Sequence, residues 1–256
     1  MAAPLTDRAA LVADQRAHPP LGSRWARAPK PIRAGATGSG TDLLVLGWTA
    51  DDLAAERAAG ARVFTALGIT PGLPVANALP GALATPGALL VGDVVEEIGA
   101  LDVPLGVIES AAAARPAWEL FDRVRPAVLI LDEGGASHLL GAAPEAERPW
   151  WAGIIWLRRG GAPPRERVFV PEAAGFRGWQ RSWLAVAEAA SFVAWSCAAG
   201  RYHVDAGVAA EVVDGELVLT PHGRSAAVVG YRSGVRASGI TAVCQCGAAG
   251  PVVETA

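Results

Sequence analysis

Three cysteines and one histidine form the most distinctive chemical pattern in the sequence. Cys197 is followed six residues later by His203, and Cys244 is separated from Cys246 by a single residue. Structural Zn²⁺ is held by four nitrogen or sulfur ligands in a tetrahedron, commonly as two pairs on two turns. The spacing therefore indicates a closed structural zinc site. The open alternative is that the cysteines are small buried apolar residues and that His203 is hydrogen-bonded at the surface.

A run of small residues at 34–41 is a candidate anion-binding loop, because small residues let backbone N–H groups approach a phosphate. The run lacks the Gly-Lys-Ser/Thr ending of a P-loop and does not open a helix directly behind a strand. A flexible glycine-rich hinge is therefore the open alternative. The residues predicted to contact an anion are Ala36, Thr37, Gly38, Ser39 and Gly40.

Composition narrows the class of protein. The chain has 256 residues, 52% of them hydrophobic, so it can bury a substantial core. Its net charge of −3 argues against nucleic-acid and membrane-surface binding, which need a basic face. No apolar run reaches the ~18–20 residues of a membrane span, and residues 1–20 lack a signal-peptide pattern. With an odd number of cysteines, this predicts a cytoplasmic protein.

The elements that must position these residues follow an alternating pattern. Helices are expected at 6–16, from the capping residue Thr49 to residue 67, at 82–98, at 111–124 and at 135–140. Buried strands are expected at 103–108, 127–131 and 154–157, and residues 74–79 are either a strand or irregular. Alternation of this kind predicts an α/β fold with a mainly parallel sheet.

The pattern changes after about residue 200. Short β-rich runs at 208–213, 217–220, 226–231 and 240–243 are separated by glycine-containing turns, which predicts an antiparallel part. The expected organisation is an N-terminal arm at 1–33, an α/β core at 34–196 and a β-rich zinc-containing subdomain at 197–256.

Several short motifs occur in a characteristic order. They are GWT at 47–49, LGITPG at 67–72, GGAP at 160–163, FVAWSC at 192–197, GRYH at 200–203, GELVLT at 215–220, GYRSG at 230–234 and CQCG at 244–247. From about residue 33 onward, this order resembles the phenylacetate–CoA ligase branch of the adenylate-forming (AMP-binding) enzymes. The resemblance implies the N-terminal subdomain of that ligase fold, ending before the C-terminal subdomain. Some members carry a structural zinc on the equivalent cysteines and histidine.

The departures from the family pattern concern ATP chemistry. The phosphate-loop lysine is replaced by Ser39, and the ribose-binding aspartate by Val235. The glutamate expected to hold Mg²⁺ falls at Ala189, unless a one-residue shift lets Glu188 substitute. Lys30 is the only lysine, so the catalytic lysine of the C-terminal subdomain has no counterpart. Loss of one such group typically costs about 10²–10³ in rate, so ATP and Mg²⁺ are not expected as cofactors.

A pocket for an acyl or aryl group is expected between the 160–163 loop and the segment 191–195. Its predicted residues are Gly160, Gly161, Trp195, Tyr202 and Arg232, with Trp183 as a further candidate. Core packing is the open alternative for the aromatic residues, and a solvated turn is the alternative for Arg232. His138 and His222 are possible general bases without an identifiable partner, so they receive no role.

Three functions remain open on this basis. The first is an enzyme of small-molecule biosynthesis that binds an acyl or aryl substrate or thioester, with repurposed, non-adenylating chemistry. The second is a non-catalytic partner of a complete ligase, a carrier protein or a tailoring enzyme. The third is residual ATP-dependent adenylation of a carboxylate. A homo-oligomer, most simply a dimer, is expected in order to cover exposed apolar surface.

Overall fold

The computed structural model of the protein describes residues 5–79, 86–143, 151–160 and 176–255. Its elements, in chain order, are α1 (Arg8–Ala17), η1 (Ser23–Arg27), β1 (Arg33–Thr37), η2 (Gly40–Asp42), β2 (Leu44–Trp48), α2 (Ala50–Leu67), β3 (Pro74–Asn77), α3 (Pro86–Glu97), β4 (Leu101–Pro104), α4 (Ala111–Val124), β5 (Val128–Leu131), α5 (Glu133–Gly141), β6 (Gly153–Arg159), β7 (Trp179–Val186), β8 (Ala190–Ser196), β9 (Tyr202–Val204), β10 (Val208–Val213), β11 (Glu216–Pro221), β12 (Tyr231–Thr241) and β13 (Val252–Thr255).

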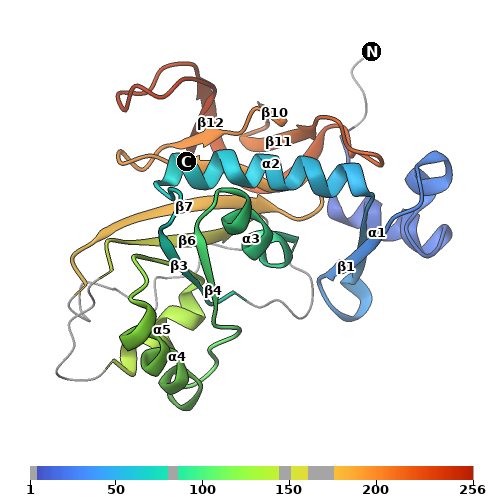
Figure 1. Ribbon diagram of the computed structural model, residues 1–256. Coiled ribbons are helices and arrows are strands. Elements are labelled where there is room, and N and C mark those ends of the chain that lie inside the picture. Colours follow the sequence, from blue (N-terminus) through green and yellow to red (C-terminus); the bar gives the residue numbers. More distant parts are fainter. Residues whose placement is uncertain (1–4, 80–85, 144–150, 161–175, 256) are drawn as a thin grey trace.

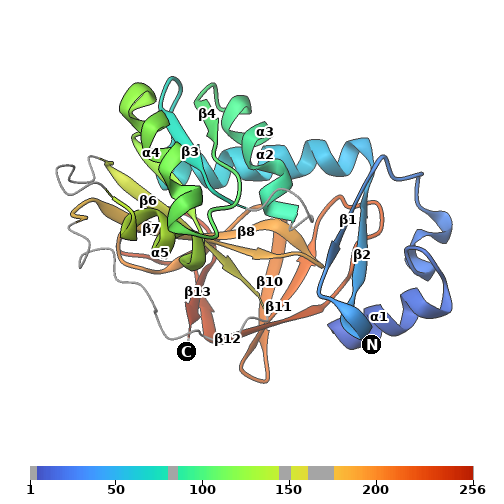
Figure 2. The same cartoon turned by 90° about the horizontal axis from the view of Figure 1, so that it is seen from below.

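One large sheet runs through the protein in the strand order β10-β11-β12-β13-β9-β8-β7-β6-β5-β3-β4 (Figures 1 and 2). The neighbours from β4 to β7 are parallel. From β7 to β10 every neighbouring pair is antiparallel. The structure thus confirms the predicted α/β class, with a parallel part covered by helices followed by an antiparallel part.

Helices cover both faces of the parallel part because its strands are apolar on both sides. In β5, Val128 and Ile130 belong to a core with α2 and α3, whereas Leu129 and Leu131 belong to a second core with α4 and α5. This alternation is the two-residue period of a strand. Among the described residues, no helix combines the length and the apolar character needed to cross a membrane.

The run of small residues at 34–41 is not a loop throughout. Residues 33–37 form β1, which pairs antiparallel with β2, and the turn between them begins at Gly38. Gly38 has a φ of 75°, a conformation that favours glycine. Of the predicted anion-binding residues, Ala36 and Thr37 therefore lie on a strand, and Gly38, Ser39 and Gly40 form the tip of the hairpin.

Two expected strands are corrected, and one hairpin was missed. Residues 103–108 were expected to be a buried strand, but β4 ends at Pro104 and residues 105–108 lie outside any strand. The sequence did not reveal the β7–β8 hairpin, which spans residues 179–196.

Residues 226–231 were expected to be a strand, but residues 226–230 form a loop and β12 begins at Tyr231. Side-chain contacts fix both ends of this loop, because the Ser225 amide donates to Asp52 of α2 (2.8 Å) and the Gly230 amide donates to Thr220 Oγ1 of β11 (2.9 Å). The beginning of the helix expected at 82–98 lies outside the described residues.

The N-terminus of α2 is fixed by a capping box. The Asp52 amide donates to Thr49 Oγ1 (3.1 Å), and the Thr49 amide donates to Asp52 Oδ2 (2.9 Å). Burial alone would raise the pKa of Asp52, but hydrogen bonds from Thr49 and Ser225 outweigh it and lower this pKa. The helix ends at Gly68, whose φ of 104° lies in the left-handed region, as the sequence predicted.

Replacing Asp52 with Asn should lower the free energy of unfolding by about 1 kcal/mol at neutral pH, because an amide oxygen cannot accept from both sides as the carboxylate does. A lowered folded-state pKa stabilises the protein above the unfolded pKa of about 3.9, and this stabilisation is lost as the pH falls through the folded value. The difference from the wild type should therefore shrink in acid. Urea unfolding at several pH values measures it, with the exposed neighbour Asp51→Asn as control. A pH-independent difference would contradict this assignment.

Candidate functional site

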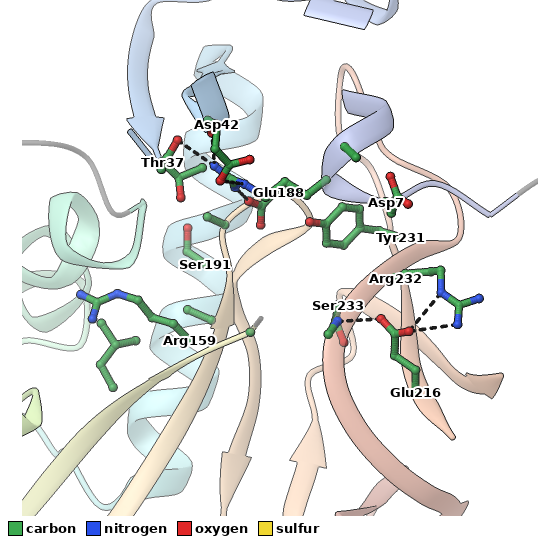
Figure 3. Close-up of a pocket in the computed structure, with 18 residues that line it drawn as sticks. Asp7, Thr37, Asp42, Arg159, Glu188, Ser191, Glu216, Tyr231, Arg232 and Ser233 are labelled. Atoms are coloured by element: carbon green, nitrogen blue, oxygen red, sulfur yellow. Dashed lines mark hydrogen bonds and ion pairs between the residues drawn. The ribbon is translucent and has the colours of Figure 1, made fainter. Parts of the chain in front are cut away.

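A cavity of about 610 Å³ lies at the carboxyl ends of β6 and β7, where the sheet changes from parallel to antiparallel pairing (Figure 3). Ligands of open α/β sheets bind at such positions. The N-terminal segment, the β1–β2 turn and the start of β12 complete its wall. The polar and charged side chains that line it belong to Asp7, Arg8, Thr37, Asp42, Arg159, Glu188, Ser191, Glu216, Tyr231, Arg232 and Ser233.

Arg8 from α1 occupies the turn where an anion was expected. Its Nη2 donates to the backbone oxygens of Thr37 (2.9 Å) and Asp42 (2.7 Å), and its Nε donates to Asp42 Oδ2 (2.7 Å). Its Nη1 contacts a carboxylate oxygen of Glu188. An ideal Cβ built on Gly38 would lie 2.2 Å from Arg8 Nη2, so glycine is needed for this approach. The turn thus presents oxygen atoms to the Arg8 guanidinium.

Glu188 lies at the tip of the β7–β8 hairpin and lines the cavity, whereas the neighbouring Ala189 does not. In the sequence, the family's metal-binding glutamate falls at Ala189, or at Glu188 after a shift of one residue. With that shift, a carboxylate lies in the cavity wall. That carboxylate is 9% exposed and is engaged by Arg8. The hydroxyl of Tyr231 points toward it (Figure 3). Burial, the Glu188 charge and a hydrogen bond to Glu188 raise the pKa of Tyr231, so the phenol stays protonated.

Arg232 lines the cavity, but its guanidinium is already paired. Its Nε and Nη2 both lie 3.0 Å from Glu216 Oε2, and its Nη1 lies 3.7 Å from Asp214. Glu216 also accepts from the Gly234 amide (2.7 Å). The role of Arg232 as an anchor for an anionic ligand stays a prediction, and such a ligand would compete with Glu216.

The other predicted pocket residues divide into two groups. Gly160 lines the cavity, and an ideal Cβ there would lie 2.7 Å from Val186 and 3.0 Å from the Ser233 carbonyl. Gly161 lies outside the described residues. Neither Trp195 nor Tyr202 lines the large cavity. Trp195 stacks on His203 instead, with ring centroids 4.5 Å apart.

Trp183 is a core residue. Its ring packs against Phe64 (5.2 Å between centroids) and Phe192 (6.0 Å), and its indole N–H donates to the Ser191 carbonyl (3.1 Å). His138 and His222 are exposed and do not line the cavity. Packing, the alternative left open for the aromatic residues, accounts for Trp183 and Trp195.

A second cluster joins the end of β8, β9 and the turn before β13. The ligand atoms of Cys197, His203, Cys244 and Cys246 all lie within 4.8 Å of one another. Cys197 Sγ is 3.8 Å from Cys244 Sγ, and Cys246 Sγ is 3.2 Å from His203 Nε2. These separations suit a tetrahedral ion, since Zn–S bonds of about 2.3 Å place sulfurs roughly 3.8 Å apart. Burial lowers the pKa of His203, which keeps the imidazole neutral for coordination. The group could hold a metal ion.

Within the described residues, each arginine that lines the large cavity has a carboxylate within 4.0 Å. Arg8 has Asp42 and Glu188, Arg159 has Asp132, and Arg232 has Glu216 and Asp214. These three cations are therefore neutralised within the protein. Sequence reasoning missed Arg8, because its partners lie between 29 and 180 residues away along the chain.

Comparison with solved structures identifies the fold, whereas comparison of sequences finds no significant match. No family model matches the chain, and no curated protein matches it significantly. A 2-hydroxyisobutyryl-CoA ligase in an open conformation superposes on it with a TM-score of 0.82 at 21% identity, covering 98% of this chain. The protein has the fold of adenylate-forming CoA ligases. It spans 62% of the length of that ligase.

Two further ligases of this fold are more distant. The N-terminal domain of FACL13 from Mycobacterium tuberculosis matches with a TM-score of 0.58 at 12% identity, over 76% of this chain and 50% of that domain structure. O-succinylbenzoate coenzyme A synthetase from Bacillus subtilis, in complex with AMP, matches with a TM-score of 0.52 at 14% identity, over 76% and 41% of the two chains. These similarities show the fold alone. The chemistry of the cavity follows from the residues that line it.

Replacing Arg8 with Ala should lower the free energy of unfolding by about 2 kcal/mol, because it leaves the enclosed Glu188 carboxylate without its cation. Arg16→Ala on the same helix is the matched control, since Arg16 is exposed and donates to the Thr41 carbonyl. Urea unfolding of the two variants measures the difference. Equal stability of both variants would show that the Arg8 contacts contribute nothing.

Proposed function

We propose that this ligase-like protein binds an acyl or aryl compound, as an acid or thioester, in the large cavity and does not adenylate it. The pairing of Arg8, Arg159 and Arg232, the cavity arginines among the described residues, with protein carboxylates carries this proposal. Adenylation requires a polyphosphate to be neutralised by cations. In this wall, a nucleotide would have to displace Asp42 and Glu188 from Arg8, or Glu216 from Arg232.

The replaced family residues favour the same conclusion. Ser39, at the tip of the β1–β2 hairpin, offers no cation to a phosphate. Val235 packs against the core and offers no carboxylate to a ribose. A nucleotide site is thus changed at three points. Ser39 replaces the lysine, Val235 replaces the aspartate, and Arg8 occupies the turn that would hold a phosphate.

The floor of the cavity suits an apolar group. Leu157 from β6, Ala185 from β7 and Ala187 from the following turn line it beside the Tyr231 ring. Burial of such surface stabilises a ligand by ~25 cal/mol per Å² before the costs of binding. An acyl or aryl body against this floor, with its polar end toward Ser191 or Arg232, fits the distribution of side chains. We assign this binding to small-molecule biosynthesis.

Ligand binding and adenylation are tested separately. Acyl and aryl acids and their thioesters should raise the melting temperature, whereas ATP with Mg²⁺ and AMP should not. ATP–pyrophosphate exchange with the same acids should stay at the level of the protein-free blank. Ala9→Trp should reduce the thermal shift because it fills the mouth of the cavity, and Ala112→Trp on the exposed face of α4 should leave it unchanged.

Two results would overturn the proposal. The first is exchange that requires the protein and disappears in Glu188→Gln, which would establish adenylation. The second is the absence of a thermal shift with every acid and thioester in the wild type, which would remove the large cavity as a binding site and favour the non-catalytic partner.

We further propose that the Cys₃His cluster holds one structural zinc ion. Its four ligands fill a tetrahedron and leave no open position for a substrate. The ion would join the end of β8 to the turn before β13, two segments separated by 47 residues. Because such binding energy is folding energy, removal of the metal should destabilise the protein.

Elemental analysis of protein purified without chelators should find one zinc per chain. His203→Ala should lose the metal and melt at a lower temperature, whereas His222→Ala, which changes an exposed histidine outside the cluster, should keep both properties. Absence of stoichiometric zinc from the wild-type protein would exclude the assignment.

A further inference from the structure

A second, smaller cavity of about 50 Å³ lies on the other side of the β7–β8 turn. It is enclosed by η1, β2, that turn and the loop before β12, and it shares the wall formed by Ala187 and Glu188 with the large cavity. Its lining includes Arg24, Trp25, Trp48, Asp52 and Arg224. The space admits a few water molecules or a carboxylate group and excludes a nucleotide or an aromatic acid.

Arg24 is the charged group in this cavity that the fold leaves uncompensated. It makes no hydrogen bond and no ion pair with any residue in the described part of the chain, and its buried Nε has no partner. Burial lowers the pKa of Arg24, against weaker opposite effects of Asp14 and Tyr231. A guanidinium whose Nε is buried without a partner is costly, so an anion that reaches it gains binding free energy.

The other charges around the cavity are already engaged. Arg224, whose side chain is 13% exposed, is paired with the buried Glu56. Asp52 accepts from the amides of Thr49 and Ser225. The Glu188 carboxylate is held by Arg8 on the side of the large cavity. The lining therefore presents one unpaired guanidinium beside a second that is held in place.

We propose that this cavity is a binding site for the carboxylate group of a short organic acid, with Arg24 as its principal ligand and Arg224 as the neighbouring cation. A planar guanidinium forms two parallel hydrogen bonds with a carboxylate, a geometry that a spherical halide cannot match. The indoles of Trp25 and Trp48 enclose the short apolar part of the acid. This site is independent of the proposed function of the large cavity.

Sodium formate, acetate, propionate and benzoate are the probes, titrated at constant ionic strength against sodium chloride. Formate and acetate should change the tryptophan emission saturably, because Trp25 and Trp48 line the cavity. Benzoate and chloride should not produce this change. Arg24→Gln should raise the dissociation constant of acetate by about 10- to 100-fold, the range for a charge-assisted hydrogen bond. Arg27→Gln, an exposed arginine of the same short helix, should leave it within about twofold.

The size series on the wild-type protein keeps the test decisive if Arg24→Gln does not fold. Absence of saturable binding by formate and acetate would overturn the proposal. Equal binding of chloride and acetate would also overturn it, because it would identify a general anion site. Binding of acetate that Arg24→Gln leaves unchanged would exclude Arg24 as the ligand. Binding of benzoate with the same response would locate the effect in the large cavity.

Discussion

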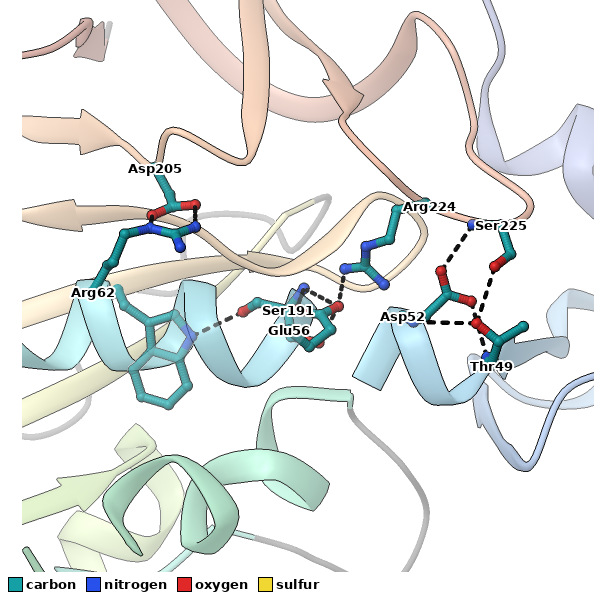
Figure 4. A network of polar contacts seen from close by, with 9 residues as sticks. Thr49, Asp52, Glu56, Arg62, Ser191, Asp205, Arg224 and Ser225 are labelled. Carbon is teal, nitrogen blue, oxygen red and sulfur yellow. Dashed lines mark hydrogen bonds and ion pairs between the residues drawn. The ribbon is translucent and has the colours of Figure 1, made fainter. Parts of the chain in front are cut away.

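The carboxylate of Glu56 lies inside the protein, 1% exposed, and the positions of both cavity walls depend on its neutralisation. It accepts from the amide (3.1 Å) and hydroxyl (3.0 Å) of Ser191 at the start of β8, and it contacts the Arg224 guanidinium (Figure 4). A buried charge that loses its partner is strongly destabilising. These contacts fix the hairpin that carries Glu188 and the loop that leads to Tyr231 and Arg232.

Helix α2 thereby serves as the common support of the antiparallel half. Near its N-terminus Asp52 holds Ser225, and further along Arg62 forms a two-pronged pair with the buried Asp205 at 2.9 and 2.6 Å (Figure 4). Its apolar side meets the sheet through Phe64, which contacts Trp183 and Phe192 edge-on. One helix thus joins both cavity walls to the apolar core.

Local signals in the sequence predicted much of this arrangement. Thr49 and Gly68 marked the ends of α2, and the spacing of Cys197, His203, Cys244 and Cys246 identified four ligand atoms that the fold brings together. The sequence could not predict the contacts of residues whose side chains suit more than one environment. Trp195 suited a pocket as well as it suits a stack on His203, and no neighbour of Arg8 in the sequence indicates its place in the β1–β2 turn.

The position of β13 bears on how the chain is made. This strand, residues 252–255, lies inside the sheet, paired with β12 on one side and with β9 on the other. The meander of β10, β11 and β12 can form by local pairing as soon as it is synthesised. Until residue 255 is available, however, β9 and β12 each present an unpaired edge, and such edges promote aggregation. Closure of the sheet therefore waits until residues 252–255 have left the ribosome, and these two edges are what a chaperone bound to the nascent chain would have to shield.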